Sequence, residues 1–259
     1  MIEDYVLYRF GYPESLLSPL RQFLRPSHDK NAKCVLDLGC GTGLVTESFL
    51  GFYPLQSQIH LMDPDPMMLQ QAKDRFQSHS NIATLVCAPS EKIPFPDGTF
   101  DFVLIGSAWH WMIADQSLFE IERVLKPGGG VFIFEYQFPK ALEYSELNDW
   151  IRIQFNTHWK PAVQKPRGSL REITKCWRDH SQFSQIHEGV VIQNRAHDAR
   201  ALTGVIASQS RYQDYEKNFK SAERIKIREA LEGKLSEFLK HQLVNFRYEY
   251  EGYLFKKRL

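Results

Sequence analysis

One stretch of this sequence, CVLDLGCGTGLVTESF at residues 34–49, limits what the chain can fold into more than any other. An apolar run that contains Asp37 ends at Leu38, glycines then occupy every second position, and a helical pattern begins near Leu44 or Val45. The glycines are Gly39, Gly41 and Gly43. A loop without Cβ atoms at the start of a helix lets backbone N–H groups approach a ligand closely. The stretch therefore predicts a ligand-binding turn between a strand and a helix.

The residues around this loop indicate the kind of ligand. A dinucleotide-binding loop would need Gly or Ala where this chain has Leu44, and a phosphate loop would need Gly-Lys-Ser or Gly-Lys-Thr, which is absent. Asp37 lies beside the loop, where its carboxylate would repel a pyrophosphate and attract an amino group. Asp63 ends the next apolar run, 20 residues after Gly43, a position from which a carboxylate accepts hydrogen bonds from ribose hydroxyls. A nucleoside that carries an amino acid fits both carboxylates.

Strand-like and helical segments alternate in the first part of the chain. Short apolar runs are separated by segments with helical patterns, such as residues 67–77 and 116–125. The expected strands are residues 32–38, 58–62, 82–87, 100–106 and 130–136. This rhythm predicts a parallel sheet that is covered by helices on both faces.

The alternation of strand-like and helical segments ends after Tyr136. Residues 141–182 contain Trp150, Phe155, Trp159 and Trp177 among charged residues and no clear strand, so we expect a mainly helical insertion. The expected later elements are strands at residues 183–193 and 244–257 and helices at residues 197–207 and 222–241.

Composition sets the class of protein. A chain of 259 residues with 43% hydrophobic residues can bury the core of one large α/β domain. The sequence shows no signal-peptide pattern and no apolar run near the roughly 18 residues of a membrane span, so we expect a cytoplasmic protein without a membrane partner. The four cysteines form no CxxC pair, which argues against a metal site.

Charge is unevenly distributed. The net charge of +1 argues against a nucleic-acid-binding protein. Residues 1–140 carry 11 Lys+Arg against 16 Asp+Glu, a balance of −5, whereas residues 141–259 carry 21 against 15, a balance of +6. The basic part is either a solvated face or a surface that recruits an acidic molecule.

Several further motifs occur in a recognisable order. They are VLDLGCGTG, LMDPDPMMLQQA, APSEKIPFPDGTFDFVLIGSAWHWM and VLKPGGGVFIF. In this order they resemble the successive motifs of class I S-adenosylmethionine-dependent methyltransferases. Within that superfamily, LYRFGYP, APSEKIP, AWHWM and the closing YEGYLFKKR are similar to the type 11 group, which includes the trans-aconitate methyltransferases.

The resemblance implies a fold and a domain plan. It implies a Rossmann-like, mainly parallel sheet of seven strands, the last antiparallel, with helices on both faces and a helical cap. The chain would be a single methyltransferase domain over residues 1–259, acting as a monomer or homodimer. Its parts would be an N-terminal lid helix at 1–25, a cofactor-binding core at 30–140, the cap at 141–182 and C-terminal elements at 183–259 that complete the sheet and the acceptor pocket.

The resemblance also implies which residues bind S-adenosylmethionine, the cofactor that becomes S-adenosylhomocysteine. The glycine loop, including Cys40, would hold the methionine part, with Asp37 near its ammonium and Asp63 on the ribose. The adenine would contact Pro64, Met68, Ser90 and Glu91. Many relatives have Gly-x-Ala-Glu at residues 88–91, where this chain has Ala-Pro-Ser-Glu.

The acceptor side involves a second set of residues. His110 and Trp111, in the motif after the fourth expected strand, are the candidate catalytic residues at the carboxyl edge of the sheet. The candidate acceptor-binding residues are Arg9, Tyr12, Arg200 and Arg211. A guanidinium binds a carboxylate in a planar, bidentate manner, so at least one of these arginines is expected to point into the acceptor cavity near Trp111.

We expect methylation of a small acidic metabolite, at a carboxylate oxygen. A carboxylate is ionised at pH 7 and needs no general base. One alternative is a methyltransferase acting on carbon, nitrogen or a phenol of a larger metabolite such as a quinone precursor, for which His110 would be the candidate base. Another is a cofactor-binding protein without catalytic activity.

Overall fold

The structure of the protein is a computed structural model that describes residues 7–21, 32–53, 57–159 and 168–259. The chain folds into two compact units, each built from separate stretches of sequence. The sheet unit consists of Gly11–Tyr136, Arg167–Val191 and Tyr250–Leu259. The helical unit consists of Met1–Phe10, Gln137–Pro166 and Ile192–Glu249. Residues 141–182, expected as one helical insertion, contribute to both units.

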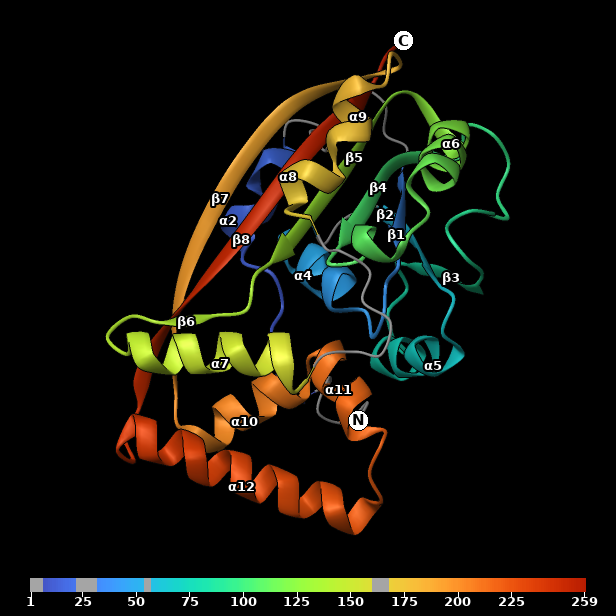
Figure 1. The fold of residues 1–259 in the computed structure, drawn as a ribbon. Coiled ribbons are helices and arrows are strands. Elements are labelled where there is room, and N and C mark those ends of the chain that lie inside the picture. The colour runs from blue at the N-terminus through green and yellow to red at the C-terminus, as the bar shows by residue number, and fades with distance from the viewer. Residues whose placement is uncertain (1–6, 22–31, 54–56, 160–167) are drawn as a thin grey trace. The chain divides into compact units, whose positions relative to one another are not determined.

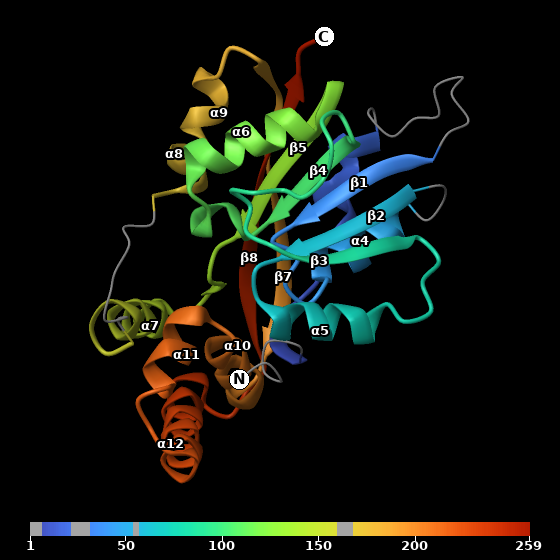
Figure 2. The ribbon, with the colours of Figure 1, turned by 90° about the vertical axis from the view of Figure 1, so that its right-hand side faces the viewer.

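The described residues form an eight-stranded sheet, one strand more than expected, and the sheet unit contains all or part of seven of these strands (Figure 1). Its strands are β1 (Lys33–Leu38), β2 (Ser57–Asp63), β3 (Ile82–Cys87), β4 (Phe100–Gly106), β5 (Leu125–Tyr136), and parts of β7 (Phe183–His197) and β8 (Val244–Lys257). The spatial order is β3-β2-β1-β4-β5-β8, and β7 also pairs with β8 (Figure 2). The first five strands are parallel to their neighbours, and β8 is antiparallel to β5. The expected mainly parallel sheet with an antiparallel last strand is therefore confirmed.

The middle strands are apolar along their length because both of their faces are covered. Residues 35–38, 102–106 and 131–134 are buried without interruption. Side chains of one face, including Val103 and Ile133, form a core with Leu118 and Ile121 of the helix that precedes β5. This continuous burial explains why the strands could be recognised as unbroken apolar runs.

Helices of the sheet unit lie on both faces of the sheet. Their bounds are α2 (Glu14–Leu17), η1 (Ser18–Leu20), α4 (Leu44–Phe52), α5 (Pro66–Arg75), η2 (Trp109–Trp111), α6 (Ala114–Val124), α8 (Leu170–Ile173) and α9 (Lys175–Asp179). Helix α5 begins where the Asp65 carboxylate accepts the N–H of Met67 and where Pro66 fixes the first helical residue. The glycine loop joins β1 to α4, which places it at the carboxyl edge of the sheet.

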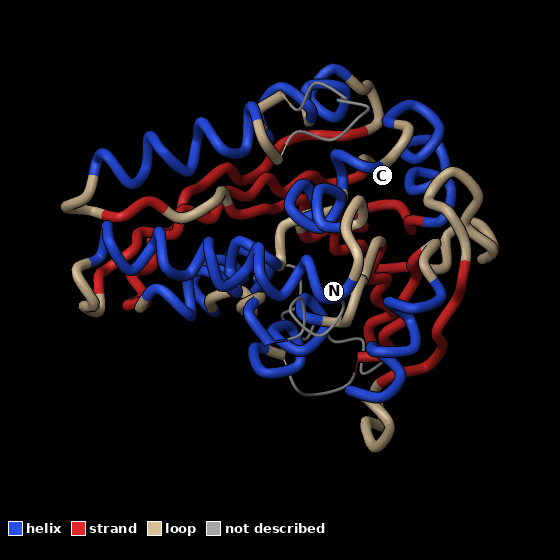
Figure 3. The backbone as a smooth tube through the Cα atoms, turned by 60° about the horizontal axis from the view of Figure 1, so that its bottom comes forward, coloured by secondary structure: helices blue, strands red, loops and turns tan. Residues whose placement is uncertain are grey.

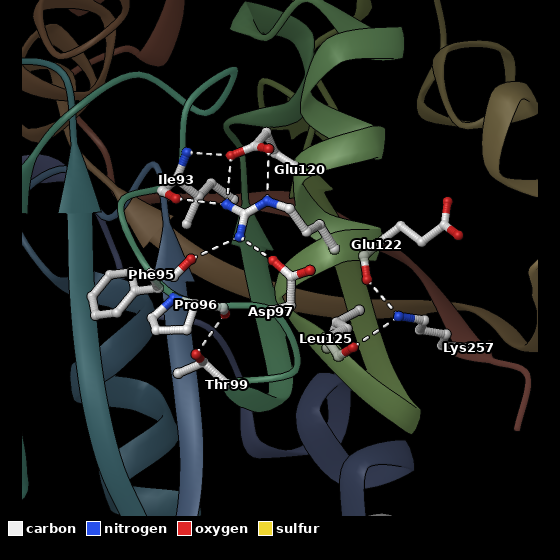
Figure 4. A network of polar contacts seen from close by, with 10 residues as sticks. Ile93, Phe95, Pro96, Asp97, Thr99, Glu120, Glu122, Leu125 and Lys257 are labelled. Atoms are coloured by element: carbon white, nitrogen blue, oxygen red, sulfur yellow. Dashed lines mark hydrogen bonds and ion pairs between the residues drawn. The ribbon is translucent and has the colours of Figure 1, made fainter.

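A polar network fixes the long loop between β3 and β4 (Figure 4). Arg123 of α6 donates hydrogen bonds to the carbonyls of Ile93 and Phe95 and to the carboxylates of Asp97 and Glu120. Because the guanidinium serves several groups of the loop at once, it holds the loop against α6. The same loop carries the candidate adenine contacts at its beginning.

The helical unit consists mainly of helices packed beside the outer parts of β7 and β8 (Figure 3). Its elements are β6 (Lys140–Ala141), α7 (Ser145–Thr157), α10 (Ala199–Ala207), α11 (Ser210–Glu216) and α12 (Ser221–Leu239). Strand β6 is a two-residue addition that pairs with β8 and was not expected. Glu216 of α11 is fully buried and accepts two hydrogen bonds from Arg228 of α12, which joins these helices.

No helix in the described part of the chain combines the length and apolar character that crossing a membrane requires.

Candidate functional site

The loop between β1 and α4 has a backbone that only glycine adopts easily. Gly39, Gly41 and Gly43 have φ angles of +73°, +54° and +86°, in the left-handed region. A Cβ atom on Gly39 would lie 2.6 Å from the Cβ of Ala108, and one on Gly43 would lie 2.4 Å from the ring of Phe76. Conformation therefore favours glycine at all three positions, and lack of space also requires it at Gly39 and Gly43.

The N–H groups of this loop are used within the protein. Gly39 and Cys40 both donate to the carbonyl oxygen of Met62, and Gly41 donates to the Asp63 carboxylate over 2.8 Å. These three donors therefore have acceptors within the protein, and a contact of the loop with a ligand remains a prediction. The loop lies beside the end of β2 and takes its acceptors there. A loop whose donors are used in this way is poorly suited to phosphate.

Asp37 places a buried carboxylate beneath the loop. Its side chain is inaccessible to solvent, and Oδ2 accepts hydrogen bonds from the backbone N–H and the hydroxyl of Thr46, at 3.1 and 2.6 Å. Its Oδ1 accepts no hydrogen bond from the described residues. Burial raises the pKa of Asp37 to about 7, Thr46 opposes this rise, and the nearby charge of Asp63 adds to it. The carboxylate thus lacks a cationic partner within the described structure.

Asp63 adds a second carboxylate at the end of β2. Oδ1 accepts the N–H of Asp65 at 2.9 Å and Oδ2 accepts the N–H of Gly41 at 2.8 Å, so the side chain also shapes the loop. Burial raises the pKa of Asp63. Burial, with the charges of Asp37 and Asp63, also raises the pKa of the Cys40 thiol well above its ordinary value. Burial is the main cause of these pKa shifts, and a cation beside the two buried carboxylates would stabilise their ionised forms.

The residues predicted to pack on an adenine follow β2. Pro64 is exposed, and Met68, on the first turns of α5, is half-buried. Their contact with an adenine ring remains a prediction.

Ser90 and Glu91, predicted to contact the adenine edge, bind the start of α6. The Ser90 hydroxyl lies 2.9 Å from the hydroxyl of Ser117, and Glu91 Oε1 accepts the N–H of Ile113 at 2.7 Å. Burial would raise the pKa of Glu91, but the hydrogen bonds from Ile113 and neighbouring groups outweigh it and lower the pKa. These residues therefore help position α6, and their contact with a ligand stays a prediction.

The motif after β4 forms the short helix η2 and separates its two tryptophans. Trp109 is buried, donates to the carbonyl of Ile173 and packs on Trp177, whereas the side chain of Trp111 is 59% exposed. Trp109 is therefore the tryptophan of this motif that belongs to the core. Trp111 is thus exposed, and its predicted catalytic role remains a prediction.

His110 lies between these tryptophans and faces a carboxylate. Its Nδ1 is 3.5 Å from Oε2 of Glu135 near the end of β5, and the two side chains are only 10% and 20% exposed. The sequence analysis did not identify Glu135. The available signal was an acidic residue at the carboxyl end of an otherwise apolar strand, VFIFEY. Thr42, in the glycine loop, was also missed; its buried hydroxyl has no partner among the described residues.

Tyr12 lies at the same edge of the sheet unit. Its hydroxyl is 3.0 Å from the hydroxyl of Ser107, and its ring packs edge-on against Phe134. Ser107 has a φ of +52°, which is uncommon for a residue with a side chain and marks strain just after β4. Tyr12 therefore contacts the segment that carries His110, and its predicted role in acceptor binding remains a prediction.

The three candidate arginines all lie in the helical unit. Arg9 donates to the carbonyl of Ser208 and to the side chain of Gln209. Arg200 is exposed on α10, and Arg211 is half-buried on α11. Trp111 belongs to the sheet unit, so an arginine near it remains a prediction. Among the described residues, no three or more His, Cys, Asp or Glu side chains are grouped to hold a metal ion.

Comparisons with known proteins agree with this geometry. Residues 36–133, which include the glycine loop, both buried carboxylates and His110, match the methyltransferase domain family Methyltransf_11. The ubiquinone/menaquinone biosynthesis C-methyltransferase UbiE of Marinomonas sp. (strain MWYL1) is 32% identical over 149 residues. That alignment covers 56% of this chain and 57% of the relative, so the chain spans little more than half the length of this curated relative.

Solved structures show the same fold over nearly the whole chain. A protein from Anaeromyxobacter dehalogenans, provisionally assigned as a type II methyltransferase, has a TM-score of 0.64 at 17% identity, covering 95% of this chain and 97% of its own. The [4+2]-cyclase SpnF has a TM-score of 0.55 at 17% identity, covering 95% and 82%. At such low sequence identities the similarity shows the fold alone. Proteins with one fold can have different activities. Residues 36–133 therefore match a methyltransferase domain, and the ordered motifs resemble those of the class I S-adenosylmethionine-dependent methyltransferases.

Proposed function

We propose that this protein transfers the methyl group of S-adenosylmethionine to a small molecule. The observation that carries the proposal is the pair of buried carboxylates, Asp37 and Asp63, on either side of a glycine loop that has no space for a Cβ atom at Gly39. A ligand with positive charge relieves the cost of burying these carboxylates, whereas a phosphate increases it. S-adenosylmethionine carries a positive ammonium and a positive sulfonium.

The residues fit the parts of this cofactor. The unsatisfied Oδ1 of Asp37 would accept a hydrogen bond from the ammonium, directly or through water. Asp63 uses one lone pair on each oxygen for a backbone N–H, and the remaining lone pairs can accept the ribose hydroxyls. The Thr42 hydroxyl is a further buried group that the methionine part could satisfy.

The protein's contribution to the reaction is mainly alignment. Bound S-adenosylmethionine supplies a methyl carbon made electrophilic by positive sulfur, and the acceptor atom must meet it in line with the carbon–sulfur bond. Groups that fix this geometry contribute much of the rate enhancement. Ala108 and Met112, on either side of His110, both lie close to Gly39, so the His110 segment flanks the cofactor loop.

Two acceptor classes have support. The basic balance of residues 141–259 and the arginines of the helical unit favour an acidic molecule, as expected for methylation of a carboxylate. The C-methyltransferase name of the UbiE relative favours an acceptor that loses a proton from carbon.

Binding calorimetry with S-adenosylmethionine tests the cofactor assignment. Asp63→Asn should weaken binding by about 2 to 4 kcal/mol, the worth of two charge-assisted hydrogen bonds. Asp65→Asn removes an equally negative side chain two residues away, which caps α5, and serves as the matched control. Thermal unfolding of both variants checks that the sheet unit remains folded. Equal affinities in the two variants would contradict the assignment.

A further inference from the structure

Asp37 carries one carboxylate oxygen that is buried without a hydrogen-bond donor. The side chain is inaccessible to solvent, and only Oδ2 is satisfied, by the N–H and the hydroxyl of Thr46. Oδ1 has no hydrogen-bond partner, and no cation among the described residues forms an ion pair with Asp37. Burying an unpaired charge is so costly that such a carboxylate either binds a proton or meets a cation.

The strands and the loop around Asp37 bring apolar or acidic groups to it. Strand β2 places Leu61 beside Asp37 and ends at Asp63, and β4 places Leu104 on the other side. The glycine loop adds the buried Cys40 thiol, whose pKa is raised by burial and by the charges of Asp37 and Asp63. Within the described residues, the titratable groups of β2 and of the loop that act on Asp37 are therefore acidic.

Helix α4 also leaves the carboxylate without a countercharge. The helix contains no Lys, Arg or His, and its Glu47, next to Thr46, is 53% exposed and paired with Arg75 at 2.6 Å. Burial raises the pKa of Asp37 to about 7, the hydrogen bonds of Thr46 oppose this rise, and the charge of Asp63 adds to it. Below neutral pH, most of the protein without cofactor therefore carries a proton on Asp37.

We propose that Asp37 exchanges this proton for the ammonium group of S-adenosylmethionine, so that cofactor binding releases a proton from the buried site. The inference rests on the proposed function. An ammonium beside Oδ1 favours the ionised carboxylate, as any adjacent cation does. The O–H bond of the carboxyl group breaks, its electron pair stays on the carboxylate, and the proton passes to the buffer.

Cofactor affinity is therefore linked to pH. The proton stabilises the free site and competes with the ammonium, so affinity should rise with pH and level off above the pKa of Asp37 in the free protein. With that pKa at about 7, affinity should increase about fivefold between pH 6 and pH 7. An α-amino group has a higher pKa, near 8, so the ammonium of the ligand stays largely charged over this range.

Calorimetry in two buffers of different ionisation enthalpy counts the protons that binding releases. With S-adenosylhomocysteine, the wild type should release about 0.9 proton at pH 6 and about 0.5 at pH 7. 5′-Methylthioadenosine lacks the ammonium and should bind without releasing a proton. The matched control is Asp65→Asn, which removes the exposed carboxylate that caps α5 and should release as many protons as the wild type.

Asp37→Asn separates Asp37 from Asp63 as the source of the proton. Binding of S-adenosylhomocysteine to this variant should release no proton, because the amide that replaces the carboxyl group does not titrate. Equal proton release by Asp37→Asn and the wild type overturns the inference, as does binding to the wild type at pH 6 without proton release, and neither result contradicts the proposed function. Absence of any binding of S-adenosylhomocysteine to the wild type overturns both.

A second measurement needs no variant. Carbon-13 NMR of the Asp37 carboxyl carbon in the wild type should give a titration midpoint at about pH 7 without ligand. Saturating S-adenosylhomocysteine should move this midpoint down by about two pH units or more, because the ammonium stabilises the carboxylate. An Asp37 midpoint at about pH 4 in the free protein, the value of an ordinary aspartate, overturns the inference.

Discussion

Replacing Asp37 by Asn tests the electrostatic account of the site most quantitatively. The substitution keeps the shape of the side chain and an oxygen that can accept the hydrogen bonds of Thr46. It removes the negative charge that burial makes costly. The account therefore predicts opposite effects on the stability of the free protein and on ligand binding.

The magnitude follows from the pKa. Burial raises the pKa of Asp37 from 3.8 to about 7, and each pKa unit corresponds to about 1.4 kcal/mol, so the ionised form destabilises the fold by about 4 kcal/mol. The folded protein binds this proton more tightly than the unfolded chain. The stability that Asp37 contributes is therefore complete below about pH 4, falls as pH rises to about 7, and is constant above that value.

Urea unfolding followed by circular dichroism between pH 4 and pH 8 measures the effect. The free energy of unfolding of Asp37→Asn minus that of the wild type should increase by about 4 kcal/mol over this range. Asp65→Asn reports the general effect of losing one exposed charge. A difference between Asp37→Asn and the wild type that does not change with pH would refute the reasoning.

Ligand binding should change in the other direction. S-adenosylhomocysteine keeps the ammonium, whereas 5′-methylthioadenosine lacks the amino-acid part. The wild type should prefer S-adenosylhomocysteine, and Asp37→Asn should lose most of that preference because the carboxylate that faces the ammonium is gone. An unchanged preference in calorimetry would show that Asp37 does not recognise the amino-acid part.

Two further predictions concern packing. Gly39→Val would place a side chain within 2.6 Å of the Ala108 Cβ at a left-handed φ, so calorimetry should detect no cofactor binding, and retained affinity would contradict the role of the loop. Arg228→Met would leave the buried Glu216 carboxylate without its main partner, so urea unfolding should show a loss of about 3 to 5 kcal/mol. A loss below about 1 kcal/mol would mean that Glu216 is satisfied by other groups.

Most of the sheet could be predicted from the sequence because its strands are short apolar or alternating runs between helical segments, and the middle ones are buried on both faces. The runs at residues 82–87, 100–106 and 244–257 coincide with β3, β4 and β8. Strand β5 was expected from Gly130 but begins at Leu125, because a Pro-Gly-Gly sequence that is typical of a turn is accommodated as an irregular strand start beside β4. Local composition therefore identified the regular part of β5 and missed its irregular start.

The candidate site was predicted less completely, for physical reasons. The positions of Asp37 and Asp63 follow from strand ends, which the apolar runs define. The pairing of His110 with Glu135 depends on how the fold brings η2 beside the end of β5, and a single sequence does not show which residues meet there. The use of the loop N–H groups by Met62 likewise depends on how closely β2 lies beside β1.

The central claim is that the sheet unit binds S-adenosylmethionine and the protein transfers its methyl group. The most direct test is mass spectrometry of a small-molecule extract incubated with the protein and trideuteromethyl-labelled S-adenosylmethionine, alongside Asp63→Asn and Asp65→Asn. The account predicts a labelled product and S-adenosylhomocysteine in equal amounts with the wild type and Asp65→Asn, and much less of both with Asp63→Asn. If the wild type binds the cofactor but forms no labelled product, the proposed methyl transfer is contradicted, and the protein binds the cofactor without using it in catalysis.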